Sequence, residues 1–372
     1  MPSSISSSEP DRLGGRRAEA PWRAVPALPW GRTLVLALML FALAMVGWEV
    51  FWRSEQFRPS YRNSDGLWAM TRARLDREGP GGTAIIGSSR VLFDLDLEVW
   101  RDETGTMPVQ MALEGTNPRP VLAHLANASD FNGLLVVGVT PPLFFTPGFG
   151  YREAALEHYL TETPSEWLGQ RISMVIEPVL AFYHFDTALF TVLRRQGWWP
   201  EREDVYVEPA VRKLANMRTT REAPLWSRVE QDEAYREIVC NTWLAILNAP
   251  REMPTPEVAK KMFEELLDEV DANVRKIRER GGEVVFVRAP SSGPFREVEN
   301  KAFPREKTWD VLLQHTGAVG VHFEDYGDLS DVQTPEWSHI RAGETERFTR
   351  ALIAHLREAL AARGASRPEL SP

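Results

Sequence analysis

Five short apolar runs, separated by stretches with helical spacing, constrain the fold of this 372-residue chain more than any other feature. The runs predict strands at residues 84–87, 109–113, 134–139, 283–287 and 319–323. Helices are predicted between them, and a final amphipathic helix is predicted at residues 342–363. Strands that alternate with helices are typical of parallel βαβ units. We therefore expect an α/β fold with a three-layer, doubly wound and mainly parallel sheet.

The N-terminal region holds a second constraint, because residues 33–48 carry no charge and are mostly Leu, Ala, Val and Met. A membrane span needs about 20 apolar residues, which this segment reaches at residue 52. Five arginines precede the segment: Arg12, Arg16, Arg17, Arg23 and Arg32. The positive-inside rule then predicts a single-pass anchor at 33–52 in the inner (cytoplasmic) membrane, with a cytoplasmic N-terminus and an extracytoplasmic, periplasmic main domain. The alternative is a signal peptide cleaved at Ala42-Leu43-Ala44.

The rest of the chain divides unevenly around the predicted strands. The expected parts are a disordered cytoplasmic tail at 1–32, a polar lead-in at 53–82, an exported domain at 83–364 and a flexible tail at 365–372. Within the exported domain, residues 143–254 are rich in aromatic side chains and contain no strand pattern, which predicts a helical insertion. Its aromatic residues either pack the insertion itself or form a cap, or a surface facing the membrane or a partner.

Composition excludes several classes of function. A net charge of −9 gives no basic surface for nucleic acid, so we expect no nucleic-acid partner. Cys240 is the only cysteine, which excludes an internal disulfide and a cysteine-based zinc site. Apart from His339, the histidines lack the spacing of metal ligands, so we expect neither a metal nor another cofactor.

Residues suited to nucleophilic catalysis follow the predicted strands. Ser89 follows the first strand in the sequence Gly87-Ser88-Ser89-Arg90, and Glu336 and His339 lie three residues apart before the final helix. The carboxyl ends of parallel strands meet at one edge of a sheet, so these side chains are expected to converge. A serine hydroxyl becomes a nucleophile when a histidine takes its proton and an acid orients that histidine. We therefore predict a Ser89-His339-Glu336 triad.

Further residues are expected to bind substrate at the same edge. The Ser89 and Gly115 amides and the Asn117 side chain are the candidate donors to a developing oxyanion. Ser292 and Arg296, on the loop after the fourth strand, could line an acceptor site. The alternative for this loop is a structural turn around Gly293-Pro294.

The motifs resemble those of the SGNH (GDSL-like) hydrolases. Residues 85–90 resemble the first block, whose last serine is the nucleophile, and this maps the nucleophile onto Ser89. Residues 336–340 resemble the last block, an acid-x-x-His sequence, and Gly115 resembles the glycine of the second block. The sequence departs from the family in having Glu336 instead of Asp, and in lacking the third-block Asn within 138–140. The resemblance implies an SGNH/flavodoxin-like fold and an acyl-serine intermediate.

An N-terminal anchor joined to such a domain is similar to the membrane-anchored accessory proteins of polysaccharide O-acyltransfer systems. The resemblance implies a membrane-bound O-acyltransferase as the acyl source and a cell-envelope polysaccharide as the acceptor, with O-acetylation as the expected reaction. Two alternatives remain. One is a carbohydrate esterase or deacetylase, which passes the acyl group to water. The other is a catalytically inert SGNH-like module that binds glycan or scaffolds a complex.

Overall fold

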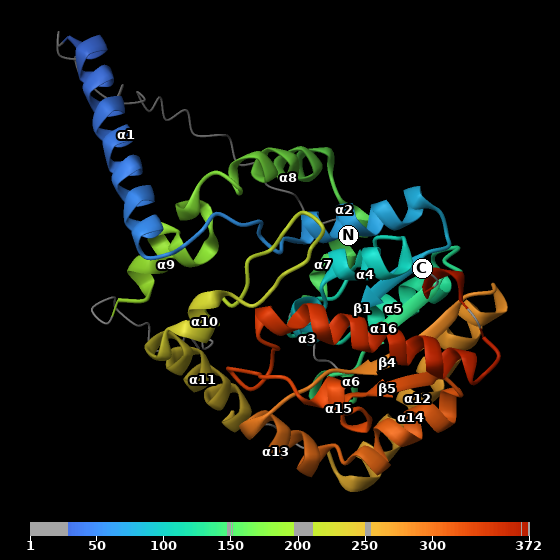
Figure 1. The fold of residues 1–372 in the computed structure, drawn as a ribbon. Coiled ribbons are helices and arrows are strands. Elements are labelled where there is room, and N and C mark those ends of the chain that lie inside the picture. The colour runs from blue at the N-terminus through green and yellow to red at the C-terminus, as the bar shows by residue number, and fades with distance from the viewer. Residues whose placement is uncertain are drawn as a thin grey trace, which may run out of the picture. The chain divides into compact units, whose positions relative to one another are not determined.

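A computed structural model describes residues 29–146, 150, 152–196, 211–249, 254–365 and 367–370. The chain divides into two units, residues 1–48 and residues 49–372. Most of the first unit that is described belongs to helix α1 (Trp30–Ser54), whose last turns belong to the second unit (Figure 1). Helix α1 buries no side chain and is long and apolar enough to cross a membrane, a property that signal sequences share. Residues 1–28 of the predicted tail lie outside the described residues.

The second unit is built on a five-stranded parallel sheet, so the predicted α/β class is confirmed. The strands are β1 (Thr83–Ile86), β2 (Val109–Gln110), β3 (Leu134–Gly138), β4 (Glu283–Arg288) and β5 (Val319–His322). Their order is β2-β1-β3-β4-β5, and each neighbouring pair is parallel. This order is one of the common doubly wound orders, and it reverses direction between β1 and β3. Ligands in such sheets bind at the carboxyl ends of the strands on either side of the reversal.

Strand β2 is shorter than the predicted 109–113, because its ladder with β1 pairs only Val109 and Gln110, with Ala84 and Ile85. The Met111 and Leu113 amides still bind carbonyls along the β1 segment. On the outer side, the buried Arg221 guanidinium donates to the carbonyls of Gln110 and Ala112 at 2.7 and 2.8 Å. Carbonyls that would pair with another strand are therefore satisfied by a side chain.

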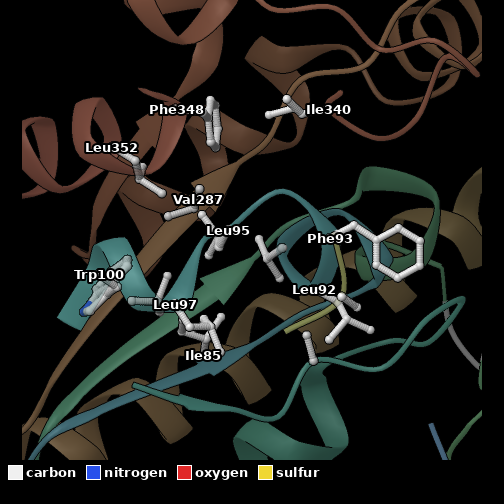
Figure 2. Packing of buried hydrophobic residues seen from close by; sticks show 14 of the residues in the cluster. Ile85, Leu92, Phe93, Leu95, Leu97, Trp100, Val287, Ile340, Phe348 and Leu352 are labelled. Atoms are coloured by element: carbon white, nitrogen blue, oxygen red, sulfur yellow. The ribbon is translucent and has the colours of Figure 1, made fainter. Parts of the chain in front are cut away.

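Apolar side chains alternate between the two faces of the sheet and form two cores. On one face, Ile85, Val136 and Val287 pack with α3 (Ser89–Phe93), α4 (Leu97–Thr104) and α16 (Thr345–Ala361), as Figure 2 shows for Ile85 and Val287. On the other face, their sequence neighbours pack with four helices: α2 (Asp65–Glu78), α5 (Arg119–Asn127), α12 (Pro256–Glu279) and α14 (Trp309–Thr316). Helices thus cover both sides of the strands.

The two segments that flank the predicted exported domain are more ordered than expected. In the predicted lead-in, α2 places Trp68 and Leu75 in the core, so this segment is part of the body. In the predicted flexible tail, Leu370 is 3% exposed and its carbonyl accepts from Arg357 Nε, so residues 367–370 pack against the body. The remaining tail residues 366, 371 and 372 lie outside the described residues.

The predicted insertion contains helices and isolated bridges but no strand in its described part. Its longer helices are α7 (Ala154–Thr161), α8 (Pro164–Ile176) and α11 (Glu233–Asn248), and its shorter ones are α9 (Leu189–Arg194) and α10 (Ser227–Gln231). Helix α6 (Pro141–Phe144) crosses the predicted start of the insertion. The remaining helices of the body are α13 (Gly293–Ala302) and α15 (Gly327–Ser330). Helix α11 contacts α13, and so brings the end of the insertion to the carboxyl edge of the sheet (Figure 1).

Candidate active site

The loop after β1 lies where the strand order reverses. Ser88 Oγ and Thr140 Oγ1, which follow β1 and β3, are 2.5 Å apart in a hydrogen bond. Close packing holds the two loops together, because a Cβ on Gly138 would lie 2.5 Å from a Val91 methyl carbon. The Gly87-Ser88-Ser89 turn therefore occupies the expected ligand-binding position of a doubly wound sheet.

The two serines of this turn have different surroundings. Ser88 is 1% exposed and its hydroxyl is used in the bond to Thr140. Ser89 is partly exposed, begins α3, and makes no side-chain hydrogen bond among the described residues. Of the two, only Ser89 combines access for a substrate with a free hydroxyl.

Helix α3 lies directly along the segment that contains His339. Three successive contacts join them: Arg90 Nε to Ser338 Oγ at 3.4 Å, the Phe93 ring to the His339 ring with centroids 4.5 Å apart, and the Ile340 amide to Asp94 Oδ1 at 2.9 Å. Ser89 and Phe93 are four residues apart and share one face of α3. The face that carries Ser89 is thus the face against which the His339 ring packs.

His339 and Glu336 form a buried pair. Glu336 Oε1 accepts from the His339 Nδ1 at 2.8 Å and from the His339 amide at 2.7 Å, and the two side chains are 1% exposed or less. With the proton on Nδ1, the Nε2 atom is the free acceptor. Nε2 is buried and has no hydrogen-bond partner. The imidazole is therefore held with Nε2 unpaired, and no hydrogen bond joins this atom to Ser89 Oγ in the structure.

The acid of the pair is held by a third residue from the insertion. Trp243 of α11 donates from Nε1 to Glu336 Oε2 at 2.6 Å. Burial by itself raises the pKa of Glu336, but the His339 charge and the hydrogen bonds from His339 and Trp243 outweigh it, so the pKa is lowered. Glu336 is therefore a stable carboxylate that can orient His339 and stabilise its protonated form.

The backbone between the acid and the histidine is strained. Trp337 has φ of 73°, a left-handed conformation that is rare for a bulky residue. A Cβ on Gly293, which itself has φ of 50°, would lie 2.8 Å from the Trp337 indole. The Ser292 amide also donates to the Trp337 carbonyl at 2.9 Å. The loop after β4 therefore packs against the turn that contains Glu336 and His339 and stabilises it.

A buried ionic cluster supports the residue next to Ser89. Glu299 of α13 accepts from Arg90 at 2.6 Å and from Arg288 at 2.5 Å, and also from Ser291 at 2.6 Å. Burial raises the pKa of Glu299, but the charges of the two arginines more than offset this, and the pKa falls to about 2. The cluster ties α3 to β4 and α13, and so fixes the start of α3.

The other predicted site residues are the two candidate oxyanion donors, Gly115 and Asn117, and the two candidate acceptor-site residues, Ser292 and Arg296. Gly115, with φ of 60°, and Asn117 lie on the loop after the β2 segment; Asn117 Oδ1 accepts from the Arg119 amide, which leaves its Nδ2 unused among the described residues. Ser292 Oγ accepts from Thr334 at 2.7 Å. Arg296 pairs with Glu324 and lies over the Phe323 ring. Arg296 is thus engaged with the η4 segment (Phe323–Asp325) rather than with His339.

Sequence reasoning missed Trp243 and Thr140. Trp243 is one of 13 tryptophans and has no spacing relationship with Glu336, so only the three-dimensional structure identifies it. Thr140 could have been found, because it lies two residues after β3, at the carboxyl edge of the sheet where the site residues were expected. No group of three or more metal-binding side chains occurs within the part of the chain that the structure describes.

Comparisons of the chain with protein-family models, with curated proteins and with solved structures find no match. The chemistry of the site is therefore inferred from its own residues.

Proposed function

We propose that this protein is a membrane-anchored, SGNH-like serine O-acyltransferase that acts on an exported or cell-envelope polysaccharide. The observation that carries the proposal is the oriented His339, bonded to Glu336 through Nδ1 and with a free Nε2, packed on the helix face that bears Ser89. Nucleophilic acyl transfer requires a serine and an oriented histidine on neighbouring elements, and the proposal requires Ser89 Oγ to come within hydrogen-bond reach of Nε2 when the acyl donor binds.

The first half of the reaction forms an acyl-serine. His339 Nε2 takes the proton of Ser89 Oγ as the oxygen attacks the acyl carbonyl carbon, and Glu336 stabilises the imidazolium. The negative charge on the carbonyl oxygen is met by the Ser89 and Gly115 amides and the Asn117 Nδ2. The bond to the donor then breaks, and the leaving group takes the proton from His339.

In the second half the acceptor replaces the donor. A sugar hydroxyl gives its proton to His339 and attacks the acyl-serine carbonyl, which forms the new ester and returns the proton to Ser89. Water in place of the sugar would make the protein an esterase through the same intermediate. Three parts of the proposal rest on the resemblance of residues 85–90 and 336–340 to SGNH-like proteins of polysaccharide O-acyltransfer systems: the sugar acceptor, the acetyl group, and a membrane-bound O-acyltransferase as the donor. The proposal also takes helix α1 as the anchor predicted at 33–52.

The test is the intact mass of the full chain in detergent after exposure to a fluorophosphonate. Attack by Ser89 forms an oxygen–phosphorus bond and expels fluoride, so a single adduct is expected. Ser89→Ala and His339→Ala should abolish it, whereas Ser88→Ala, which removes the neighbouring hydroxyl, should keep it. No adduct on the wild-type chain, either purified or in native membranes, would contradict the proposal and favour the inert module.

A second test separates transfer from hydrolysis. A strain carrying Ser89→Ala should lose acylation of its envelope polysaccharide, and a Ser88→Ala strain should retain it. If the wild-type chain instead releases acetate from an acetylated glycan and both strains keep normal acylation, the protein is an esterase.

A further inference from the structure

Helix α8 in the insertion has its apolar side turned outward. Leu168, Ile172, Val175 and Val179 recur at helical spacing as one stripe that continues past the end of the helix, and they are 52–72% exposed. A surface helix in water normally shows the opposite pattern, with its apolar stripe against the core. Within the described part of α8, only Gln170 is buried.

Hydrogen bonds to the segment before α2 fix this orientation. Gln170 Oε1 accepts from Ser64 Oγ at 2.7 Å, and Glu177, the residue after the helix, accepts from the Arg62 amide at 3.0 Å. Gln170 and Glu177 lie on the side of α8 opposite to the stripe, given about 3.6 residues per turn. The polar side of α8 is thus locked inward, and the apolar stripe cannot turn toward the core.

The next segment repeats the inversion. Asp186, Thr187 and Thr191 are buried, whereas Phe185, Leu189 and Phe190 are 52–70% exposed. We call the exposed stripe of α8 together with Phe185, Leu189 and Phe190 the apolar face. Isolated exposed apolar side chains are ordinary, but two neighbouring segments with polar residues inside and apolar residues outside indicate an apolar partner.

The place where the chain enters the second unit indicates which partner this is. Glu49, the first residue of that unit, accepts from the Ala181 and Phe182 amides at 3.0 and 3.2 Å. Arg53 donates to the Val179 carbonyl at 2.7 Å. Since Glu49 directly follows the apolar run 33–48, the chain enters the second unit at the segment that joins the two parts of the apolar face.

A further pair on α8 suits a lipid headgroup region. Arg171 lies over the Trp167 ring, with its guanidinium carbon 3.4 Å from the ring centroid, at the edge of the stripe. Tryptophan is enriched at membrane interfaces, and long basic side chains extend from apolar surfaces toward headgroups. The pair therefore provides an amphipathic border between the apolar face and water.

We propose that the apolar face lies in the outer headgroup and acyl boundary of the membrane that helix α1 spans, so that the protein is held by the bilayer at two places. Apolar faces of interfacial helices bury about 5–10 Å into this boundary. The occupant is lipid and not a protein. The proposal rests on α1 acting as an anchor and goes beyond the acyl-transfer function.

The test uses the full chain in nanodiscs of phosphatidylethanolamine and phosphatidylglycerol, with no other membrane protein. In a Cys240→Ser background, an environment-sensitive fluorophore is attached to Val175→Cys or Phe190→Cys, and quenching by lipids spin-labelled near the headgroup is measured. Val258→Cys is the matched control, because Val258 is an exposed valine at 48% on α12, outside the apolar face. Leu40→Cys reports insertion of α1 by quenching from lipids labelled deep in the chain.

The expected result is strong quenching at 175 and 190 by the shallow label, deep quenching at 40, and none at 258. Quenching at 40 without quenching at 175 and 190 overturns the proposal and leaves the anchor intact. If the fluorophores at 175 and 190 are shielded from water only in native membranes, which contain other proteins, the apolar face binds a protein and not lipid. Absence of quenching at all four sites overturns both the anchor and the interfacial face, while fluorophosphonate labelling of Ser89 still tests the catalytic site separately.

Discussion

Trp243 Nε1 donates a hydrogen bond to Glu336 Oε2 at 2.6 Å, and the two residues belong to different parts of the fold. Trp243 lies on α11 in the insertion, and Glu336 lies in the turn before α16. Because Oε1 is used by His339, both oxygens of the carboxylate are held. The insertion therefore helps to position the acid of the candidate triad.

Trp243→Phe keeps an aromatic ring near Phe295 and His339 but removes the N–H donor. A hydrogen bond to a charged group contributes about 1.5–3 kcal/mol, so we expect fluorophosphonate labelling of Ser89 to slow by about 10- to 100-fold. Trp167→Phe, on the exposed side of the insertion, is the control and should label at the wild-type rate. Equal rates for all three chains would show that Trp243 does not position Glu336.

The substitutions Glu336→Gln and Glu336→Asp separate the effect of the carboxylate charge at residue 336 from the effect of its side-chain length. The amide of Gln cannot stabilise a protonated His339, so labelling of Ser89 should fall by about a thousandfold or more, as expected for loss of a triad acid. Asp keeps the charge but is one methylene shorter, and cannot reach both His339 and Trp243 without backbone movement. We expect it to be intermediate. Wild-type labelling rates in Glu336→Gln, with an unchanged melting temperature, would exclude Glu336 from the triad.

Gly138→Ala tests the close contact between β3 and α3. The added methyl would overlap Val91, and overpacking of this kind costs about 1–3 kcal/mol, so the free energy of unfolding in urea should fall by that amount. Val91→Ala in the same chain should recover part of the loss. Gly169→Ala is the control, because nothing lies within 4 Å of its Cβ position, and it should stabilise α8 by about 0.5–1 kcal/mol. Additive effects of the two core substitutions would contradict the contact.

The lowered pKa of Glu299 predicts that the free energy of unfolding falls in acid. Its pKa is about 2 in the folded protein and 4.5 for an ordinary glutamate, so its contribution is complete above pH 4.5 and is lost as the pH falls toward 2. That contribution is about 3 kcal/mol. Glu299→Gln should remove this part of the pH dependence.

The same substitution leaves Arg90 and Arg288 without their shared counter-charge, which should cost about 3–5 kcal/mol at neutral pH. The measurement is the unfolding midpoint between pH 7 and pH 3. Glu264→Gln, at an exposed glutamate of α12, should follow the wild-type curve. A Glu299→Gln curve that runs parallel to wild type would show that Glu299 is not the titrating group.

The sheet was predictable because its strands are buried on both faces and so appear as continuous apolar runs. The strand-end rule also placed Ser89 and His339 on the same side, and the contacts along α3 are consistent with that prediction. The length of β2 was not predictable, because it depends on how far the ladder with β1 extends and not on the length of the apolar run. Trp243 was not predictable, because its contact with Glu336 joins residues 93 positions apart.

The orientation of α8 shows a second limit of sequence patterns. The stripe Leu168, Ile172, Val175 and Val179 identifies a helix, but by itself indicates that this side is buried. The structure turns it outward because Gln170 and Glu177 have polar partners in the segment before α2. Periodicity finds the two sides of a helix, and only tertiary contacts decide which one faces inward.

The contacts between α3 and the His339 segment join residues far apart in the chain: 246 positions for the bond from Ile340 to Asp94 and 248 for that from Arg90 to Ser338. Closing so long a loop is slow compared with forming local helices and strands. During synthesis, Ser89 is made well before Glu336 and His339. A nascent chain that ends before residue 336 therefore carries the candidate nucleophile without the candidate acid and base, and we expect no labelling of Ser89 until both have been added.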